Sequence, residues 1–393
     1  MRCLKLCCAV VGLVLLVACA SGERMGAALP EPVDMWRDTA FAYQPELVTE
    51  TRASLFALEP DVVQALRFDS GGTVPVERRL DLLVNRFYGT GGIRLAYDAS
   101  NTTAATQTWR NRKGDCLSLT ILAYAAARHL GIAAHMQEVR VPLSVDRRDG
   151  MDFISGHVNV FVRDEAEVSF NGKSFGAGSF IIDFEPQAGS RRFGQWLSED
   201  AILARYYNNR AAQYWAQKDD TRAYAYYRAA ITTAPDFAPA YANLAQLYAR
   251  HGLDGDAEHL LRHAVALGGP TYAPLRALHR LVLAQGRTQE AQQLAELLAK
   301  RQDEDPYHWL GLGLDALQAG RNREAIAALE KAAALTTGFE EIHYHLGLAY
   351  WRDGQREAAR KQLAVLSAIN NRDPGIAVLS KKLQGIAPQS AVF

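Results

Sequence analysis

Three residues in the N-terminal half could together perform acyl-transfer chemistry: Cys116, His157 and Asp183. Cysteine attacks a carbonyl carbon as its thiolate, and a neighbouring imidazole can generate that thiolate by taking the thiol proton. A carboxylate on the other ring nitrogen would then orient the imidazole and stabilise its cation. We therefore consider Cys116 as a nucleophile, His157 as a general base and acid, and Asp183 as the orienting group.

The cysteine lies where a helix is expected to begin. The stretch RKGDCLSLTILAYAAARHLGI, residues 112–132, predicts a helix from Cys116 to Leu130 that Gly131 ends. A helix N-terminus lowers a thiol pKa, but its dipole contributes only about 0.3–1 kcal/mol. Most of the activation must therefore come from His157. The backbone N–H of Cys116 could also help to stabilise an oxyanion.

The histidine and the aspartate lie on expected strands. His157 begins HVNVFV and Asp183 ends FIID; HMQEVRV and EVSFNG have the same β-branched and aromatic character. Helical spacing in PELVTETRASLFAL and VPVERRLDLLVNRFY precedes them. Residues 35–200 are thus predicted to form an α+β domain, with helices followed by an antiparallel sheet. The polar segment 144–156 is expected to be a mobile loop before the strand of His157.

Each residue also has an ordinary structural explanation. A cysteine on an apolar helix is commonly a core residue, and an aspartate before Phe-Glu-Pro is commonly a turn residue. A histidine at a strand start is commonly a surface or capping residue. The three together, in this order and on these elements, favour a catalytic site.

These segments resemble the transglutaminase-like core, a papain-related cysteine fold. The resemblance is good over residues 104–186, which include TWRNRKGDCLSL, GHVNVFV and FIIDFEP, and looser over 35–200. It implies the three catalytic roles above and a thioester formed from a peptide or glutaminyl amide. Water would resolve that thioester in a peptidase or amidase, and an amine would do so in a transferase.

Two further positions matter for the resemblance. Trp109 matches a recurring aromatic before the cysteine, and we interpret it as packing or as shielding the thiol. Many family members carry an aromatic two residues after the histidine. Here that position is Asn159, which we expect to reshape the substrate cleft.

Other site classes are not expected. The sequence has no C-x-x-C or H-E-x-x-H, the spacing of His129 and His135 fits no metal pattern, and GTGG at 89–92 lacks the lysine of a phosphate loop. No calcium-binding motif appears either, so no metal or cofactor is predicted. The formal net charge is +0 and no basic run occurs, so a nucleic-acid partner is not expected.

The first residues indicate export. MRCLKLCCAVVGLVLLVAC has a basic start and a short apolar run, and residues 1–18 are predicted to be a signal peptide. Its end, LVAC, resembles a bacterial lipobox, which implies cleavage before Cys19 and lipidation of that thiol. Residues 19–34 would be a tether, and Ala20 suggests the outer membrane, facing the periplasm. Cys116 would then be the one remaining thiol. The alternative is an ordinary signal peptide.

The C-terminal half has an internal repeat. Alanines recur every 34 residues, and four residues after each of them comes a tyrosine, a leucine or an alanine. The pattern resembles the tetratricopeptide repeat (TPR), with five units over 204–373 and a C-terminal tail at 374–393. The third unit is the weakest, since His279 and Val282 occupy usual small and aromatic positions. The recurring alanines are Ala223, Ala257, Ala291, Ala325 and Ala359.

A TPR array stacks into a curved solenoid whose groove commonly binds a peptide or protein partner; the alternative is a spacer or dimerisation element. The complete prediction is a lipid-anchored envelope protein whose α+β transglutaminase-like domain acts on a peptide or protein and whose all-α solenoid recruits a partner. The rival prediction is a catalytically silent domain in a TPR interaction scaffold.

Overall fold

A computed structural model describes residues 35–67, 74–88, 92–98, 101–141, 145–148, 151–154, 157–163, 168–170, 173–175, 179–184, 194–268, 272–336, 339–369 and 374–384. The predicted signal peptide and the tether with Cys19 lie outside these residues. Among the helices that the structure describes, none is both long and apolar enough to cross a membrane.

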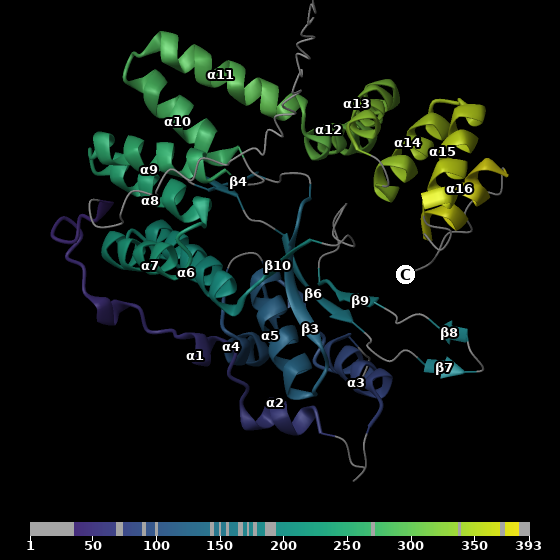
Figure 1. The fold of residues 1–393 in the computed structure, drawn as a ribbon, viewed down its shortest axis with the longest axis horizontal. Coiled ribbons are helices and arrows are strands. Elements are labelled where there is room, and N and C mark those ends of the chain that lie inside the picture. The colour runs from purple at the N-terminus through teal and green to yellow at the C-terminus, as the bar shows by residue number, and fades with distance from the viewer. Residues whose placement is uncertain are drawn as a thin grey trace, which may run out of the picture. The chain divides into compact units, whose positions relative to one another are not determined.

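A four-stranded antiparallel sheet forms one half of the N-terminal region (Figure 1). Its strands are β3 (Ala134–Val139), β6 (His157–Arg163), β9 (Ser179–Ile182) and β10 (Gln195–Leu197), in the order β10-β3-β6-β9. The valines of β6 are buried, as expected for a central strand. Helices precede this sheet in the chain, as the sequence predicts.

The early helices are shorter than expected. The segment PELVTETRASLFAL forms a 3-10 turn, η2 (Pro45–Leu47), and the four-residue helix α1 (Arg52–Leu55) instead of one helix. Thr51 accepts the N–H of Ser54 and starts α1 as a capping box, so the residues before it stay extended. The other elements here are α2 (Pro60–Ala65), α3 (Val76–Tyr88), β1 (Ala96–Tyr97), α4 (Ala105–Asn111) and β2 (Lys113–Gly114).

The expected loop at 144–156 is instead largely a hairpin. Strands β4 (Val145–Arg148) and β5 (Met151–Ile154) pair antiparallel. In the sequence, Asp-Gly separates the two strands, a pair favoured in two-residue hairpin turns, and the polar composition obscured this signal. A second hairpin joins β7 (Val168–Phe170) and β8 (Lys173–Phe175).

The central helix α5 (Cys116–His129) begins at the predicted residue and ends one residue before the predicted end, with Leu130 as its C-cap. The side chain of Asp115 caps it by accepting the N–H of Ser118 at 2.8 Å. Gly131, with φ at +65°, adopts the left-handed conformation that ends the chain's helical path. Most of the helix is buried, so it is a core element and not a surface helix.

The C-terminal half consists of paired helices. The pairs are α6 (Glu199–Ala216) with α7 (Asp220–Thr233), α8 (Ala238–Arg250) with α9 (Asp254–Leu267), α10 (Ala273–Ala284) with α11 (Thr288–Asp303), α12 (Pro306–Gln318) with α13 (Asn322–Leu335), and α14 (Glu340–Arg352) with α15 (Arg356–Ile369). The five recurring alanines each have at most 2% of their surface exposed. Only a small side chain allows the helices to approach this closely.

The C-terminal tail predicted from residue 374 begins with a helix instead. Helix α16 (Pro374–Leu383) packs against α14, and Leu379 and Leu383 are buried. A Cβ atom at Gly347 would lie 2.6 Å from Leu379 Cδ2, which shows how closely the two helices approach. The helix thus covers the apolar face that the last repeat would otherwise expose.

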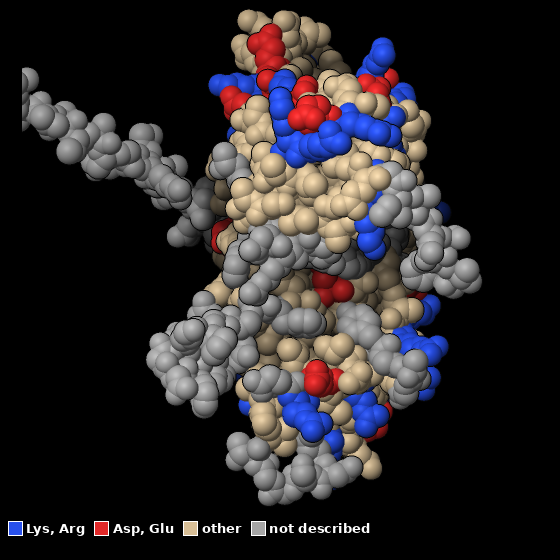
Figure 2. All heavy atoms as spheres, turned by 90° about the vertical axis from the view of Figure 1, so that its right-hand side faces the viewer, with Lys and Arg blue, Asp and Glu red and all other residues tan. Residues whose placement is uncertain are grey.

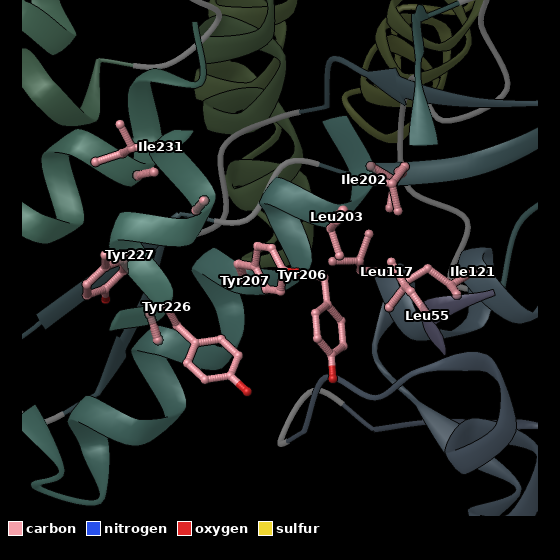
Figure 3. Close-up of a cluster of buried hydrophobic side chains, with 14 of the residues drawn as sticks. Leu55, Leu117, Ile121, Ile202, Leu203, Tyr206, Tyr207, Tyr226, Tyr227 and Ile231 are labelled. Carbon is pink, nitrogen blue, oxygen red and sulfur yellow. The ribbon is translucent and has the colours of Figure 1, made fainter. Parts of the chain in front are cut away.

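One hydrophobic core continues across the predicted boundary near residues 200–204. Figure 3 shows Leu117 and Ile121 of α5 beside Ile202 and Leu203 of α6, with tyrosines of α6 and α7 extending the cluster. This cluster runs from Met35 to Ala291. The boundary therefore separates two kinds of secondary structure but not two cores.

A second core occupies the later repeats, from Leu310 to Leu383. The two cores are separated by α11, in which every residue is described and Ala291 alone is buried. The third repeat, which the sequence identifies as the weakest, is therefore where the buried apolar surface is interrupted.

Candidate functional site

Cys116 is the first residue of α5. It is half-buried and packs against the main core. Its position follows from the local sequence: Asp115 takes the extended conformation of an N-cap, so the helical turn begins at the next residue. The thiol therefore lies at the positive end of the helix dipole.

His157 and Asp183 are in direct contact. The Nε2 atom of His157 lies 2.8 Å from Oδ2 of Asp183, and both side chains are at least 93% buried. Strands β6 and β9 are hydrogen-bonded neighbours, with Val160 opposite Ile182, so the start of β6 meets the end of β9. The structure thus brings together the predicted base and the predicted orienting carboxylate.

The cysteine helix is attached to the histidine strand. Thr120 Oγ1 donates a hydrogen bond to the carbonyl oxygen of Val158 at 3.1 Å. Thr120 lies one helical turn after Cys116, and Val158 directly follows His157. The N-terminal turn of α5 and the first residues of β6 therefore share one buried neighbourhood.

Asn159, the position at which many family members carry an aromatic, lies in the interior of the sheet. Its side chain is fully buried and donates from Nδ2 to Oδ2 of Asp183 at 3.1 Å. Its own Oδ1 accepts a hydrogen bond from Nε2 of Gln137 at 2.9 Å. Gln137 of β3 lies opposite Asn159 of β6. These contacts could be predicted only from the alignment of the two strands, which the sequence does not give.

A buried carboxyl precedes the cysteine. Burial raises the pKa of Asp115 above its ordinary value, although hydrogen bonds from Ser118 and Thr102 act in the opposite direction. Ser118 donates both its N–H and, at 2.6 Å, its hydroxyl to this carboxyl. Asn209 of α6 donates to Thr102 Oγ1 at 3.2 Å and so connects the first repeat to this cluster.

Trp109 has a packing role, one of the two interpretations drawn from the sequence. It is 8% exposed, belongs to the main core, and donates its indole N–H to Asp61 of α2 at 3.0 Å. Within the part of the chain that the structure describes, no group of three or more His, Cys, Asp or Glu side chains could hold a metal ion.

The segment from Met35 to Glu50 packs on the first two repeats, which sequence patterns did not reveal. Phe41 stacks on Tyr224 with ring centroids 4.7 Å apart. The hydroxyl of Tyr248 donates to the carbonyl oxygen of Met35 at 2.7 Å. Closely spaced aromatics in this segment were the available signal, but their partners lie more than 180 residues away.

Glu50, the last residue of this segment, binds two tyrosines of the repeats. Tyr206 donates to its Oε1 at 2.8 Å, and Tyr226 donates to its other carboxylate oxygen. Burial raises the pKa of Glu50, but these hydrogen bonds outweigh burial and leave the pKa lowered. The carboxylate therefore stays ionised while it joins the N-terminal segment to α6 and α7.

The end of β3 also reaches a later repeat. Arg140 forms an ion pair with Asp305 at 3.0 Å and lies over the ring of Tyr307 at 4.8 Å. Tyr272 donates to the same carboxylate. Asp305 is 5% exposed and caps α12, so it lies at the interruption between the two cores.

Basic and acidic side chains are interleaved on the face shown in Figure 2. Elsewhere an ion pair joins α9 to α11: Arg287, which precedes α11, contacts Glu258 of α9 at 2.7 Å. Exposed pairs of this kind contribute little stability, roughly 0.2–1 kcal/mol each.

Residues 204–237 and 316–383 each match a tetratricopeptide-repeat family model. The chain contains tetratricopeptide repeats. The second match extends through α16, so this helix belongs to the array. The prediction of TPRs is confirmed, whereas the transglutaminase-like assignment of the preceding region finds no match among these family models.

Solved TPR structures are similar to part of the chain. YrrB, described as a TPR protein with an unusual peptide-binding site, is 18% identical, with 45% of this chain and 91% of that chain covered and a TM-score of 0.24. PilF of Pseudomonas aeruginosa is 18% identical, with 48% and 86% covered and a TM-score of 0.26. PilW, described as a type IV pilus biogenesis factor, is 18% identical, with 45% and 82% covered and a TM-score of 0.24. No curated protein sequence matches the chain.

Proposed function

We propose that Cys116, His157 and Asp183 form a thiol active site of the transglutaminase-like class, which acts on a peptide or glutaminyl amide. The observation that carries the proposal is the 2.8 Å contact between the buried His157 and Asp183, beside a helix that begins at a cysteine. A buried histidine–carboxylate pair next to a thiol is the arrangement that thiolate chemistry needs.

In the proposed reaction, Nδ1 of His157 takes the thiol proton and the thiolate of Cys116 attacks the carbonyl carbon. The N–H groups at the start of α5 would stabilise the developing oxyanion. The carbon–nitrogen bond breaks, the imidazolium gives its proton to the leaving amine, and a thioester remains. Water or a second amine, deprotonated by His157, then attacks the thioester and releases the thiolate.

Alkylation of Cys116 at mild pH tests this function. Iodoacetamide should modify Cys116 of the native protein rapidly, with the modified residue identified by peptide mass spectrometry. The rate should fall in His157→Ala, by about 100-fold if the base is lost. His129→Ala, an exposed histidine at the end of α5, is the matched control and should react at the wild-type rate. Modification of Cys116 only after denaturation would remove the enzyme hypothesis.

The second candidate function is a TPR interaction scaffold whose cysteine domain is catalytically silent. The confirmed repeats favour it, because stacked TPR units present an extended surface suited to a peptide or protein. An unchanged cellular phenotype and unchanged partners in Cys116→Ala would support this alternative. Loss of the phenotype in a folded Cys116→Ala protein would favour the enzyme.

In either case, we propose that the array recruits a protein partner. Cys116→Ala protein and wild type, applied to envelope extracts, separate the two kinds of ligand. A substrate should be enriched by the inactive variant, whereas a partner of the repeats should be retained equally by both. Retention of nothing above a bead control would contradict recruitment.

We also propose that the mature chain is anchored by lipid at Cys19, in the outer membrane and facing the periplasm. The support is the LVAC sequence after an apolar run with a basic start. The intact mass of the mature chain should show cleavage before Cys19 and an added diacylglyceryl group. Cys19→Ala should abolish both, and a mature N-terminus at another residue would overturn the anchor.

A further inference from the structure

A chain of hydrogen bonds, whose central link is buried and whose other links are partly buried, starts at a backbone N–H and ends at His157. Gly194 N–H donates to Oε1 of Gln137 at 3.0 Å, and Nε2 of Gln137 donates to Oδ1 of Asn159 at 2.9 Å. Nδ2 of Asn159 then donates to Asp183 Oδ2 at 3.1 Å, the same oxygen that meets His157 Nε2. The chain runs from the residue before β10, across β3 and β6, to the residue after β9.

The direction of every link follows from the first. A backbone N–H can only donate, so the oxygen of the Gln137 amide must face Gly194 and its nitrogen must face Asn159. By the same reasoning the oxygen of Asn159 faces Gln137, and its nitrogen faces Asp183. Oδ2 of Asp183 thus accepts from Asn159, and because an ionised carboxylate has no proton to donate, the ring nitrogen that meets this oxygen must carry the proton.

The backbone start of the chain is held in place. A Cβ atom at residue 194 would lie 2.2 Å from the carbonyl oxygen of Glu138, so only glycine permits this approach to β3. Both amide side chains are fully buried, and water cannot replace the partners they have. Reversing any one amide would set two acceptors or two donors against each other.

We propose that Gln137 and Asn159 are positioning residues that specify the tautomer of His157, with the proton on Nε2 and Nδ1 as the base. The proposal rests on the proposed function, because Nδ1 is the atom that would take the proton of the Cys116 thiol. The chain itself can be tested without any reaction. Both side chains are fully buried and would act through Asp183.

An exchange of the two polar side chains tests the direction of the chain. In Asn159→Asp/Asp183→Asn, the carboxylate at 159 accepts from Gln137, and the amide nitrogen at 183 donates both to that carboxylate and to His157. The ring must then accept at Nε2, and the proton moves to Nδ1. Shape, atom count and charge are conserved, so steric effects are small.

Asp183→Asn alone is the matched control. The nitrogen of Asn159 still requires an acceptor at the shared position, so the amide oxygen at 183 should take that position and His157 should keep its proton on Nε2. Without a hydrogen bond from Asn159, the amide introduced at position 183 could present its nitrogen to the ring as readily as its oxygen. Retention of the tautomer in this variant therefore measures the effect of the chain.

The readout is the long-range 1H–15N correlation spectrum of 15N-histidine-labelled full-length protein, with the neutral ring of His157 assigned by its loss in His157→Gln. We expect Nε2–H in the wild type and in Asp183→Asn, and Nδ1–H in the exchange variant. Nδ1–H in the wild type or in Asp183→Asn, or Nε2–H in the folded exchange variant, would overturn the proposal. If the exchange variant does not fold, the wild type and Asp183→Asn decide.

Alkylation of Cys116 distinguishes this proposal from the proposed function. If the function holds, the exchange variant should react about 100-fold more slowly than wild type, because Nδ1 no longer accepts a proton. If Cys116 is unreactive in every variant while the tautomers follow the expected pattern, the function fails and the positioning role stands.

Discussion

Thr120 Oγ1 binds the carbonyl oxygen of Val158 at 3.1 Å and so joins the cysteine helix to the histidine strand. Both residues are buried. The bond ties α5 to β6 one helical turn from Cys116 and one residue from His157, so we expect it to help hold the proposed nucleophile and base in place.

Thr120→Val should therefore lower both stability and thiol reactivity. Valine conserves the shape but leaves the carbonyl of Val158 without this donor, at a cost of about 1–3 kcal/mol. Urea unfolding and the alkylation rate of Cys116 would measure the two effects. Thr106→Val removes a similar but exposed bond, to Ala57, and serves as the control. A native reaction rate in a destabilised Thr120→Val would show that the bond stabilises the fold without aligning the site.

Asp115→Asn should change how stability depends on pH. Burial raises the pKa of Asp115, so the folded state binds its proton more tightly than the unfolded state does. That contribution is fully present below the unfolded pKa, near 4, and is lost as pH rises through the raised folded value. Asparagine also caps helices well. The melting temperature of Asp115→Asn relative to wild type should thus rise between pH 4 and pH 8. A difference that is constant with pH would contradict the assignment.

Glu50→Gln should weaken the attachment of the N-terminal segment to the repeats. The pKa of Glu50 is lowered, so the carboxylate stabilises the fold above its unfolded pKa, and this contribution is lost as pH falls through the folded value. Hydrogen bonds to a charged group contribute about 1.5–3 kcal/mol, a loss expected at pH 7 in the variant. Glu46→Gln, at an exposed position of the same segment, should unfold like the wild type. Equal urea midpoints for both variants would show that Glu50 does not attach the N-terminal segment to the repeats.

Gly313→Ala should destabilise the later repeats selectively. A Cβ atom there would lie 2.5 Å from Leu329 Cγ, and overpacking of this kind costs typically about 1–3 kcal/mol. Because the two cores are separate, calorimetry should show a lower transition for the second core and an unchanged one for the first. Gly255→Ala, in α9 where a Cβ meets nothing within 4 Å, is the control and should be neutral or stabilising. A uniform shift of a single transition would show that the cores unfold together.

Local patterns were sufficient for several elements. The 34-residue spacing of alanines predicts the helix crossings because a repeat carries its own register, and Asp115 with Gly131 bounds α5 through short-range contacts. The pairing of His157 with Asp183 follows from neighbouring strands, and the resemblance supplied their order.

Other features depend on contacts that no local pattern encodes. The roles of Gln137 and Asn159 require the alignment of β3 with β6, where a shift of one residue would turn each side chain to the other face. Helix α16 was predictable in principle, since Leu379 and Leu383 have helical spacing, although residues 374–393 were predicted to be a tail. The segment that contains Phe41 covers the first repeats through contacts with residues far away in the chain, such as Tyr224.

The continuity of the first core has an evolutionary consequence. Phe41 and Glu50 are held by tyrosines of α6 and α7, so separating the N-terminal segment or the sheet from the first two repeats would expose buried surface that they share. The repeats beyond Ala291 have their own core, and recombination could exchange or multiply them without opening the first. Diversity of partners among descendants of this chain would then arise in α12 to α16, while the proposed site stays unchanged.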